Sequence, residues 1–131
     1  MTNEELDLRF LGKENPNYKK WKRQRIRKGF SDRDLWNMDA WLCNIIPDAL
    51  DRHVKRKEGD CPEGWGSSEE YILYIKNIAA DIRKAYALNN VSIEENHWPT
   101  VEQVKINKME SERLMKSAFA RLASVIWNLW D

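Results

Sequence analysis

The chain has 131 residues, of which 42% are hydrophobic and 33% are charged, and its formal net charge is +1 at pH 7. This length suits one domain with a real core, and only five Gly and four Pro argue against a loop-rich or all-β fold. No apolar run approaches the length of about 18 residues that a membrane span needs, and a net charge this small does not by itself predict a polyanionic partner.

The N-terminus and the two cysteines indicate the cellular compartment of the protein. The N-terminus is acidic and lacks the charged-then-apolar pattern of a signal peptide. Cys43 and Cys61 lack CxxC spacing, so we expect free thiols in a reducing environment rather than a disulfide. We therefore expect a cytoplasmic protein.

A basic stretch follows the turn signal at residues 15–17, and we predict a short helix over residues 18–28. Clusters of Lys and Arg mixed with aromatic residues can bind phosphates and stack on bases. The candidate phosphate-binding residues are Lys19, Lys20, Lys22, Arg23, Arg25, Arg27, Lys28 and the interleaved Trp21. The alternative is a solvated helix face that pairs with acidic residues such as Asp48, Asp51, Glu69 and Glu70.

The stretch from Gly29 to Val54 is expected to organise the fold. Gly29 should end the basic helix, and Ser31 with Asp34 has the spacing of an N-terminal capping box. A long amphipathic helix should follow, and Pro47 should kink it or divide it in two. Its predicted buried face comprises Leu35, Met38, Leu42, Ile45, Ile46, Ala49, Leu50 and His53.

Asp39 lies beside this predicted apolar face. Because buried charges are normally partnered, we expect Asp39 to form a structural ion pair or hydrogen bond. Ser31 and Asp34 are likewise expected to have structural polar roles. The alternative role for Asp39 is a ligand or metal contact.

One stretch of the sequence resembles a known motif. It is the string Gly29-Phe30-Ser31-Asp32-Arg33-Asp34-Leu35-Trp36-Asn37-Met38-Asp39, followed by Trp41-Leu42. It resembles the motif Gly-aromatic-Ser-Asp-x-Asp-x-Trp-Asn-x-Asp of a family of small uncharacterised proteins of tailed bacteriophages and prophages. Family members continue through a helix opened by acidic residues, here Ser67-Ser68-Glu69-Glu70-Tyr71, and often close on Leu-Trp-Asp, here at the end of Trp127-Asn128-Leu129-Trp130-Asp131.

The resemblance spans roughly residues 29 to 131. This chain departs from it in the middle loop and at Tyr71, where the family pattern has Trp. The resemblance implies a phage-encoded protein in the host-cell cytoplasm, and it supplies no catalytic residues.

Residues 55–66 form a charged, Gly-rich loop in which Trp65 lies between two glycines. We expect Trp65 to pack into the body and fix the loop. The alternative is an aromatic that closes over a ligand, which makes Trp65 a further ligand-binding candidate. The phosphate-cradling pattern GxxxxGK[ST] does not occur.

Two more capped helices are predicted. Ser67 and Glu70 open a helix that runs to about Leu88, with Tyr71, Ile75, Ile78, Ile82, Ala85 and Tyr86 on one face. Thr100 and Gln103 open a last helix to Trp130, with a face formed by Val104, Met115, Ala118, Phe119, Leu122, Ala123, Val125, Ile126 and Leu129. Its polar stretch 105–113 should project from the body or fray.

These elements predict an all-α fold: an antiparallel helical bundle of three long helices plus a short basic N-terminal helix. We expect one domain over residues 1–131, in which 1–28 is a basic arm and 29–131 is the bundle. The chain contains seven Trp. Trp127 and Trp130 are three residues apart near the C-terminus and so lie on one face. Simple core packing is the favoured explanation for the many Trp, and the alternative is an aromatic-lined pocket or a homo-oligomer interface, for which Trp127 and Trp130 are the candidates.

The chemistry predicted from these residues is binding without catalysis. His53 and His97 stand alone, and Asp48–Asp51 and Glu110-x-Glu112 lack the paired ExxE and ExxD arrangement of all-α nucleotide pyrophosphatases, so we expect no metal and no cofactor. The leading hypothesis is a phage accessory protein that binds a phosphate-bearing nucleotide signal or a host protein. The alternatives are nucleic-acid binding through residues 19–28 and a metal-dependent nucleotide phosphohydrolase.

Overall fold

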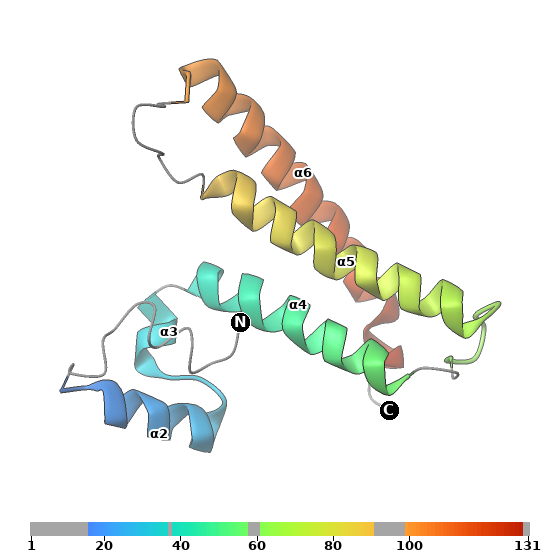
Figure 1. Cartoon of the computed structure of the whole chain (residues 1–131), viewed down its shortest axis with the longest axis horizontal. Coiled ribbons are helices and arrows are strands. Elements are labelled where there is room, and N and C mark those ends of the chain that lie inside the picture. Colours follow the sequence, from blue (N-terminus) through green and yellow to red (C-terminus); the bar gives the residue numbers. More distant parts are fainter. Residues whose placement is uncertain (1–15, 37, 58–60, 91–98, 130–131) are drawn as a thin grey trace. The chain divides into compact units, whose positions relative to one another are not determined.

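The computed structural model describes residues 16–36, 38–57, 61–90 and 99–129. Within these ranges all regular structure is helical, so the fold is all-α as predicted. The elements are α2 (Tyr18–Lys28), α3 (Asp32–Trp36), α4 (Met38–Arg56), α5 (Ser68–Asn89), α6 (Val101–Val125) and the 3-10 helix η1 (Ile126–Asn128) (Figure 1). None of the helices in the described ranges is both long and apolar enough to cross a membrane.

The chain divides into two compact units, Met1–Ile46 and Pro47–Asp131. The boundary between them lies inside α4. Each unit is described by itself below. The N-terminal part of the predicted arm, residues 1–15, and the predicted interface residue Trp130 lie outside the described residues.

In the first unit, local signals set the ends of the helices. Gly29 has a φ of 85° and its N–H donates to the Arg25 carbonyl over 2.9 Å, which ends α2 in the left-handed conformation that glycine tolerates best. The predicted capping box is confirmed, because the Asp34 N–H donates to Ser31 Oγ over 3.2 Å and the Ser31 N–H donates to Asp34 Oδ2 over 2.7 Å. The predicted long helix is covered by α3 up to Trp36 and by α4 from Met38, and residue 37 lies outside the described residues.

Pro47 is predicted to kink α4 or to divide it in two. It lies buried inside a helix that continues to Arg56, so it does not divide the helix. The predicted buried face of α4 is found only in part, since Leu50 is buried. The buried residues are Ala40, Cys43, Pro47, Leu50 and Val54, spaced by three and four. Of the predicted face, Leu35 is 49% exposed, Met38 and Ala49 are also exposed, and Leu42, Ile45, Ile46 and His53 are only half-buried. Apolar residues surround most of this helix, so periodicity alone did not single out the face on which small residues permit close packing.

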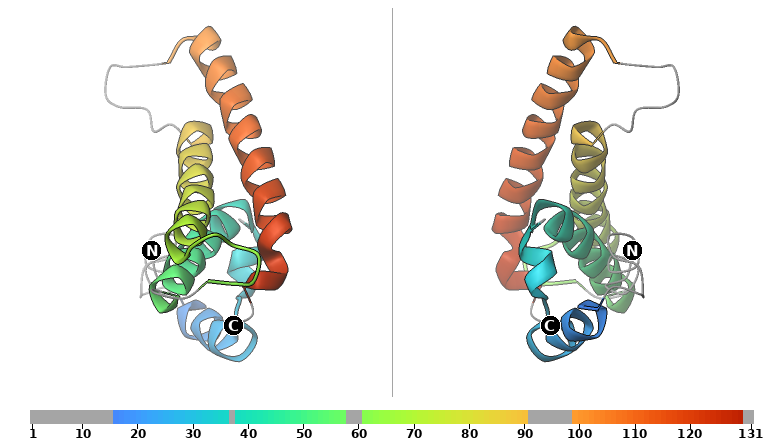
Figure 2. Two further views of the ribbon diagram at one scale, coloured as in Figure 1. Left: turned by 90° about the vertical axis from the view of Figure 1, so that its right-hand side faces the viewer. Right: turned by 90° about the vertical axis from the view of Figure 1, so that its left-hand side faces the viewer.

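In the second unit, α5 and α6 lie side by side and form the core (Figures 1 and 2). The predicted N-caps are present, because Ser67 Oγ accepts from the Glu70 N–H and Thr100 Oγ1 accepts from the Gln103 N–H. The buried residues of α5 are Tyr71, Ile75, Ile78, Ala79, Ile82 and Ala85, nearly the predicted face. Those of α6 are Ser111, Leu114, Ala118, Leu122 and Val125.

The first turns of α6 extend beyond the end of α5 (Figures 1 and 2). Residues 101–106 are all exposed, and burial begins at Ser111, where the hydroxyl donates to the Ala85 carbonyl over 2.6 Å. The polar pattern predicted that residues 105–113 project or fray, but the fully exposed stretch is 101–106, Ser111 is packed, and α6 is helical over its whole length. Val104 and Phe119 were expected in the packed face, but both are exposed, and α6 ends at Val125 rather than Trp130.

Candidate functional site

The basic helix α2 has two different faces. Tyr18, Trp21 and Arg25 are buried, and they follow one another at spacings of three and four residues. Lys20, Arg23 and Arg27 are exposed at the same kind of spacing on the opposite side. A helix rises 1.5 Å per residue, so these three cations are spread over about 10 Å of the axis. We call Lys20, Arg23 and Arg27, flanked by the exposed Lys19 and Lys28, the basic face.

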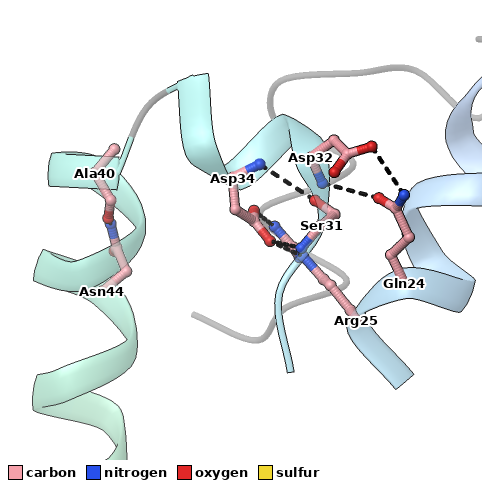
Figure 3. A network of polar contacts seen from close by, with 7 residues as sticks. All are labelled: Gln24, Arg25, Ser31, Asp32, Asp34, Ala40 and Asn44. Atoms are coloured by element: carbon pink, nitrogen blue, oxygen red, sulfur yellow. Dashed lines mark hydrogen bonds and ion pairs between the residues drawn. The ribbon is translucent and has the colours of Figure 1, made fainter. Parts of the chain in front are cut away.

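The buried side of α2 is held by a salt bridge. Arg25 Nε donates to Asp34 Oδ2 over 2.8 Å, and a second guanidinium nitrogen binds Asp34 Oδ1 (Figure 3). Burial alone would raise the pKa of Asp34, but the hydrogen bonds from Arg25 and Ser31 outweigh it and lower that pKa. Asp34 therefore remains a carboxylate that ties α2 to the start of α3.

A second pair of hydrogen bonds supports the same corner. Gln24 Nε2 donates to Asp32 Oδ2 over 2.9 Å, and the Asp32 N–H donates to Gln24 Oε1 over 2.8 Å (Figure 3). The Trp21 ring packs edge-on against Trp36 with 6.1 Å between centroids. These contacts fix the rotation of α2 about its axis, and this rotation keeps the basic face in solvent.

A surface hollow of about 480 Å³ is lined by Lys20, Arg23, Gln24, Arg27 and Lys28. Residues 16–46 contain eight Lys and Arg and three Asp, which gives this segment a net charge of +5. The whole unit Met1–Ile46 contains ten Lys and Arg and seven Asp and Glu, so its net charge is +3. An excess of cations on one helix face favours an anionic ligand.

The structure divides the predicted binding residues into two groups. Lys19, Lys20, Lys22, Arg23, Arg27 and Lys28 are exposed on α2. Arg25 and Trp21 are only 8% and 6% exposed, and they serve the fold of the first unit rather than presenting a charge or a ring to a ligand. The sequence signal for this division was the position of Arg25, which lies four residues after Trp21 and four residues before Gly29.

Trp65 lies in the second unit and fixes its loop. Its ring packs edge-on against Tyr71 and against Tyr74, each with 5.2 Å between centroids. Tyr71 is fully buried, and its hydroxyl lies 2.7 Å from His53 Nε2. Half-buried between these rings, Trp65 has the packing role that the sequence favoured over a ligand contact.

Two other predicted site residues, Asp39 and Trp127, lie outside α2. Asp39 is exposed on α4, and among the described residues no hydrogen bond or ion pair holds its carboxylate, so the expected structural partner is not found there. Trp127 on η1 is 84% exposed, and its role at an interface stays a prediction.

The acidic pair Asp48 and Asp51 faces an arginine. Arg83 on α5 donates to Asp48 Oδ1 over 3.0 Å and approaches Asp51 Oδ2 within 2.6 Å. Burial alone would lower the pKa of Arg83, but the two carboxylates outweigh it and raise that pKa. The guanidinium thus takes the position next to both carboxylates that a divalent cation would need. In the described parts of the chain, no three potential ligand side chains gather as a metal site would require.

Sequence reasoning missed one basic cluster, formed by Arg52 and Lys55 on α4 and Lys76 on α5. The sequence shows that Ile72 and Lys76 are four residues apart and that Arg52 and Lys55 are three residues apart. Only the packing of the second unit places these residues around one hollow.

No protein-family model matches this sequence, no curated protein matches it, and no solved structure matches it.

Proposed function

We propose that this protein binds the phosphate backbone of nucleic acid, without catalysis, through the basic face of α2. The observation that supports this most strongly is the division of α2 into a buried side and an exposed side. Arg25, Trp21 and Tyr18 anchor the helix, and Lys20, Arg23 and Arg27 remain available to an anion.

The spacing of these cations suits a polymer of phosphates. Duplex DNA carries about one negative charge per 1.7 Å of its axis, so cations spread over about 10 Å can each meet a different phosphate. Phosphate contacts of this kind carry little sequence information. We therefore propose binding that is weakly dependent on base sequence and strongly dependent on salt.

A polymeric ligand is better supported than a single nucleotide at this face. Recognition of one nucleotide normally adds an aromatic or apolar surface for the base. The two aromatic residues of α2, Tyr18 and Trp21, are both buried, and Trp21 packs on Trp36. Trp65 belongs to the other unit. Binding at α2 then rests on charge, not on stacking.

The biological setting proposed here rests on the motif resemblance alone. The Gly-aromatic-Ser-Asp-x-Asp-x-Trp-Asn-x-Asp string at residues 29–39 supports a phage-encoded accessory protein that acts in the host-cell cytoplasm. A nucleic-acid-binding accessory protein would act there on phage or host nucleic acid.

Fluorescence anisotropy with a labelled duplex and a labelled single strand tests this function. Lys20→Glu with Arg27→Glu should weaken binding at least about tenfold, because each reversal removes an attraction and adds a repulsion. The matched control, Lys108→Glu with Lys116→Glu on exposed positions of α6, changes the net charge equally and should leave binding almost unchanged. An equal loss of affinity in the two variants would mean that only the net charge of the protein matters, and it would reject a binding site on α2.

A further inference from the structure

The second unit contains an open hollow of about 810 Å³ between the C-terminal turns of α4 and the first half of α5. Its lining residues are Asp48, Asp51, Arg52, Val54, Lys55, Ile72 and Lys76. A volume of this size lies in the range of about 300 to 1,000 Å³ that small-molecule sites occupy.

The lining of this hollow contains three cations and two carboxylates. Arg83 on α5 pairs with both carboxylates, Asp48 and Asp51. Arg52, Lys55 and Lys76 are exposed, and in the described parts of the chain they form no hydrogen bond or ion pair. With Arg83 included, four positive charges stand against two negative charges, so these groups leave a positive excess.

The hollow also offers apolar surface. Val54, which is only 3% exposed, and the half-buried Ile72 both contribute to its lining. Ile72 and Lys76 are one turn apart on α5, so an apolar and a cationic side chain are neighbours on that side of the hollow. A ligand that matches this lining has a multiply charged anionic group joined to a flat or apolar body.

We propose that this hollow binds a soluble phosphate monoester of nucleotide size. Arg52, Lys55 and Lys76 would hold the phosphate dianion through charge-assisted hydrogen bonds, and the body of the ligand would lie on Val54 and Ile72. A dianion matches three cations better than a single carboxylate does. This site is separate from the basic face, since every lining residue belongs to the unit Pro47–Asp131.

The test uses the full chain and amide-resolved NMR titrations with AMP, inorganic phosphate and adenosine. AMP should shift the amide signals of residues 48–55 and 72–76, inorganic phosphate should compete with AMP, and adenosine should cause no comparable shifts. The absence of shifts with AMP would overturn the proposal, and so would equal shifts with adenosine or shifts centred on residues 18–28. This titration needs no variant and therefore does not depend on the folding of one.

Charge reversal supplies the second arm, measured by calorimetry with AMP. Lys55→Glu with Lys76→Glu should weaken AMP binding by a factor of about ten or more, whereas Lys108→Glu with Lys116→Glu should change it less than about twofold. Lys20→Glu with Arg27→Glu should also leave AMP binding intact. If that α2 variant abolishes AMP binding and the Lys55 and Lys76 variant does not, the ligand binds elsewhere and the proposed site is wrong.

Discussion

Arg25 on α2 and Asp34 on α3 form an ion pair in which the two side chains are only 6% and 4% exposed. The same carboxylate accepts the Ser31 N–H, so one side chain caps α3 and anchors α2. An arginine in the most basic stretch of the chain is therefore committed to the fold, and it sets which of its neighbours face solvent.

Removal of Arg25 should destabilise the first unit strongly. Arg25→Ala leaves the Asp34 carboxylate buried without its partner, a change that costs about 3 to 5 kcal/mol in typical buried pairs. Arg23→Ala, at an exposed position on the same helix, should change the free energy of unfolding by no more than about 0.5 kcal/mol. Hydrogen exchange of the α2 and α3 amides measures the loss of stability in each variant. Similar losses in Arg25→Ala and Arg23→Ala would show that the Arg25–Asp34 ion pair is unimportant for stability.

The pH dependence of stability should report on Asp34. Its pKa in the folded protein lies below its ordinary value of 3.8, so the ionised form stabilises the fold above that value. This contribution is lost as the pH falls through the folded-state pKa. From about pH 5 downward, the urea midpoint of the wild type should fall more steeply than that of Asp34→Asn. Asp39→Asn, at an exposed carboxylate of α4, should keep the wild-type slope.

The core between α5 and α6 should respond to substitution according to burial. Ile78 is fully buried, and Ile78→Ala should cost about 2 to 5 kcal/mol because it leaves a cavity. Leu73 on the same helix is 60% exposed, and Leu73→Ala should change the free energy of unfolding by about 0.5 kcal/mol or less. Thermal and urea unfolding of the two variants provide the comparison. An equal effect would mean that the packed face of α5 has been misidentified.

Tyr71 should ionise at unusually high pH. Burial raises the pKa of its phenol above the ordinary value of 10, because the phenolate would be desolvated beneath Trp65. An absorbance titration of tyrosinate should therefore contain a late step that Tyr71→Phe removes. A folded Tyr71→Phe variant with the same late step would assign that step to another tyrosine and contradict the burial of Tyr71.

The sequence predicted the features that depend on neighbouring residues. The bounds of α2, the Ser31–Asp34 capping box, the caps at Ser67 and Thr100 and the buried face of α5 all follow from local spacing. The predicted buried face of α4 was largely wrong because apolar residues surround most of that helix. The role of Arg25 was missed because a run of cations does not reveal which one meets a carboxylate nine residues away.

The hollow lined by Lys55 and Lys76 could not be predicted for a related reason. These residues are far apart in sequence, and each belongs to an otherwise ordinary amphipathic helix. Only the packing of the second unit places both around one hollow. Sites composed of residues from separate helices leave no signal in the spacing of either helix.

The salt dependence of duplex binding tests whether the exposed cations of α2 bind a phosphate backbone. Three to five phosphate contacts predict a slope of about −3 to −4.5 in a plot of log affinity against log salt, and Lys20→Glu with Arg27→Glu should reduce the magnitude of that slope by about 2. Duplex affinity that is independent of salt, or a slope that the α2 variant leaves unchanged, would show that these cations do not bind the phosphate backbone.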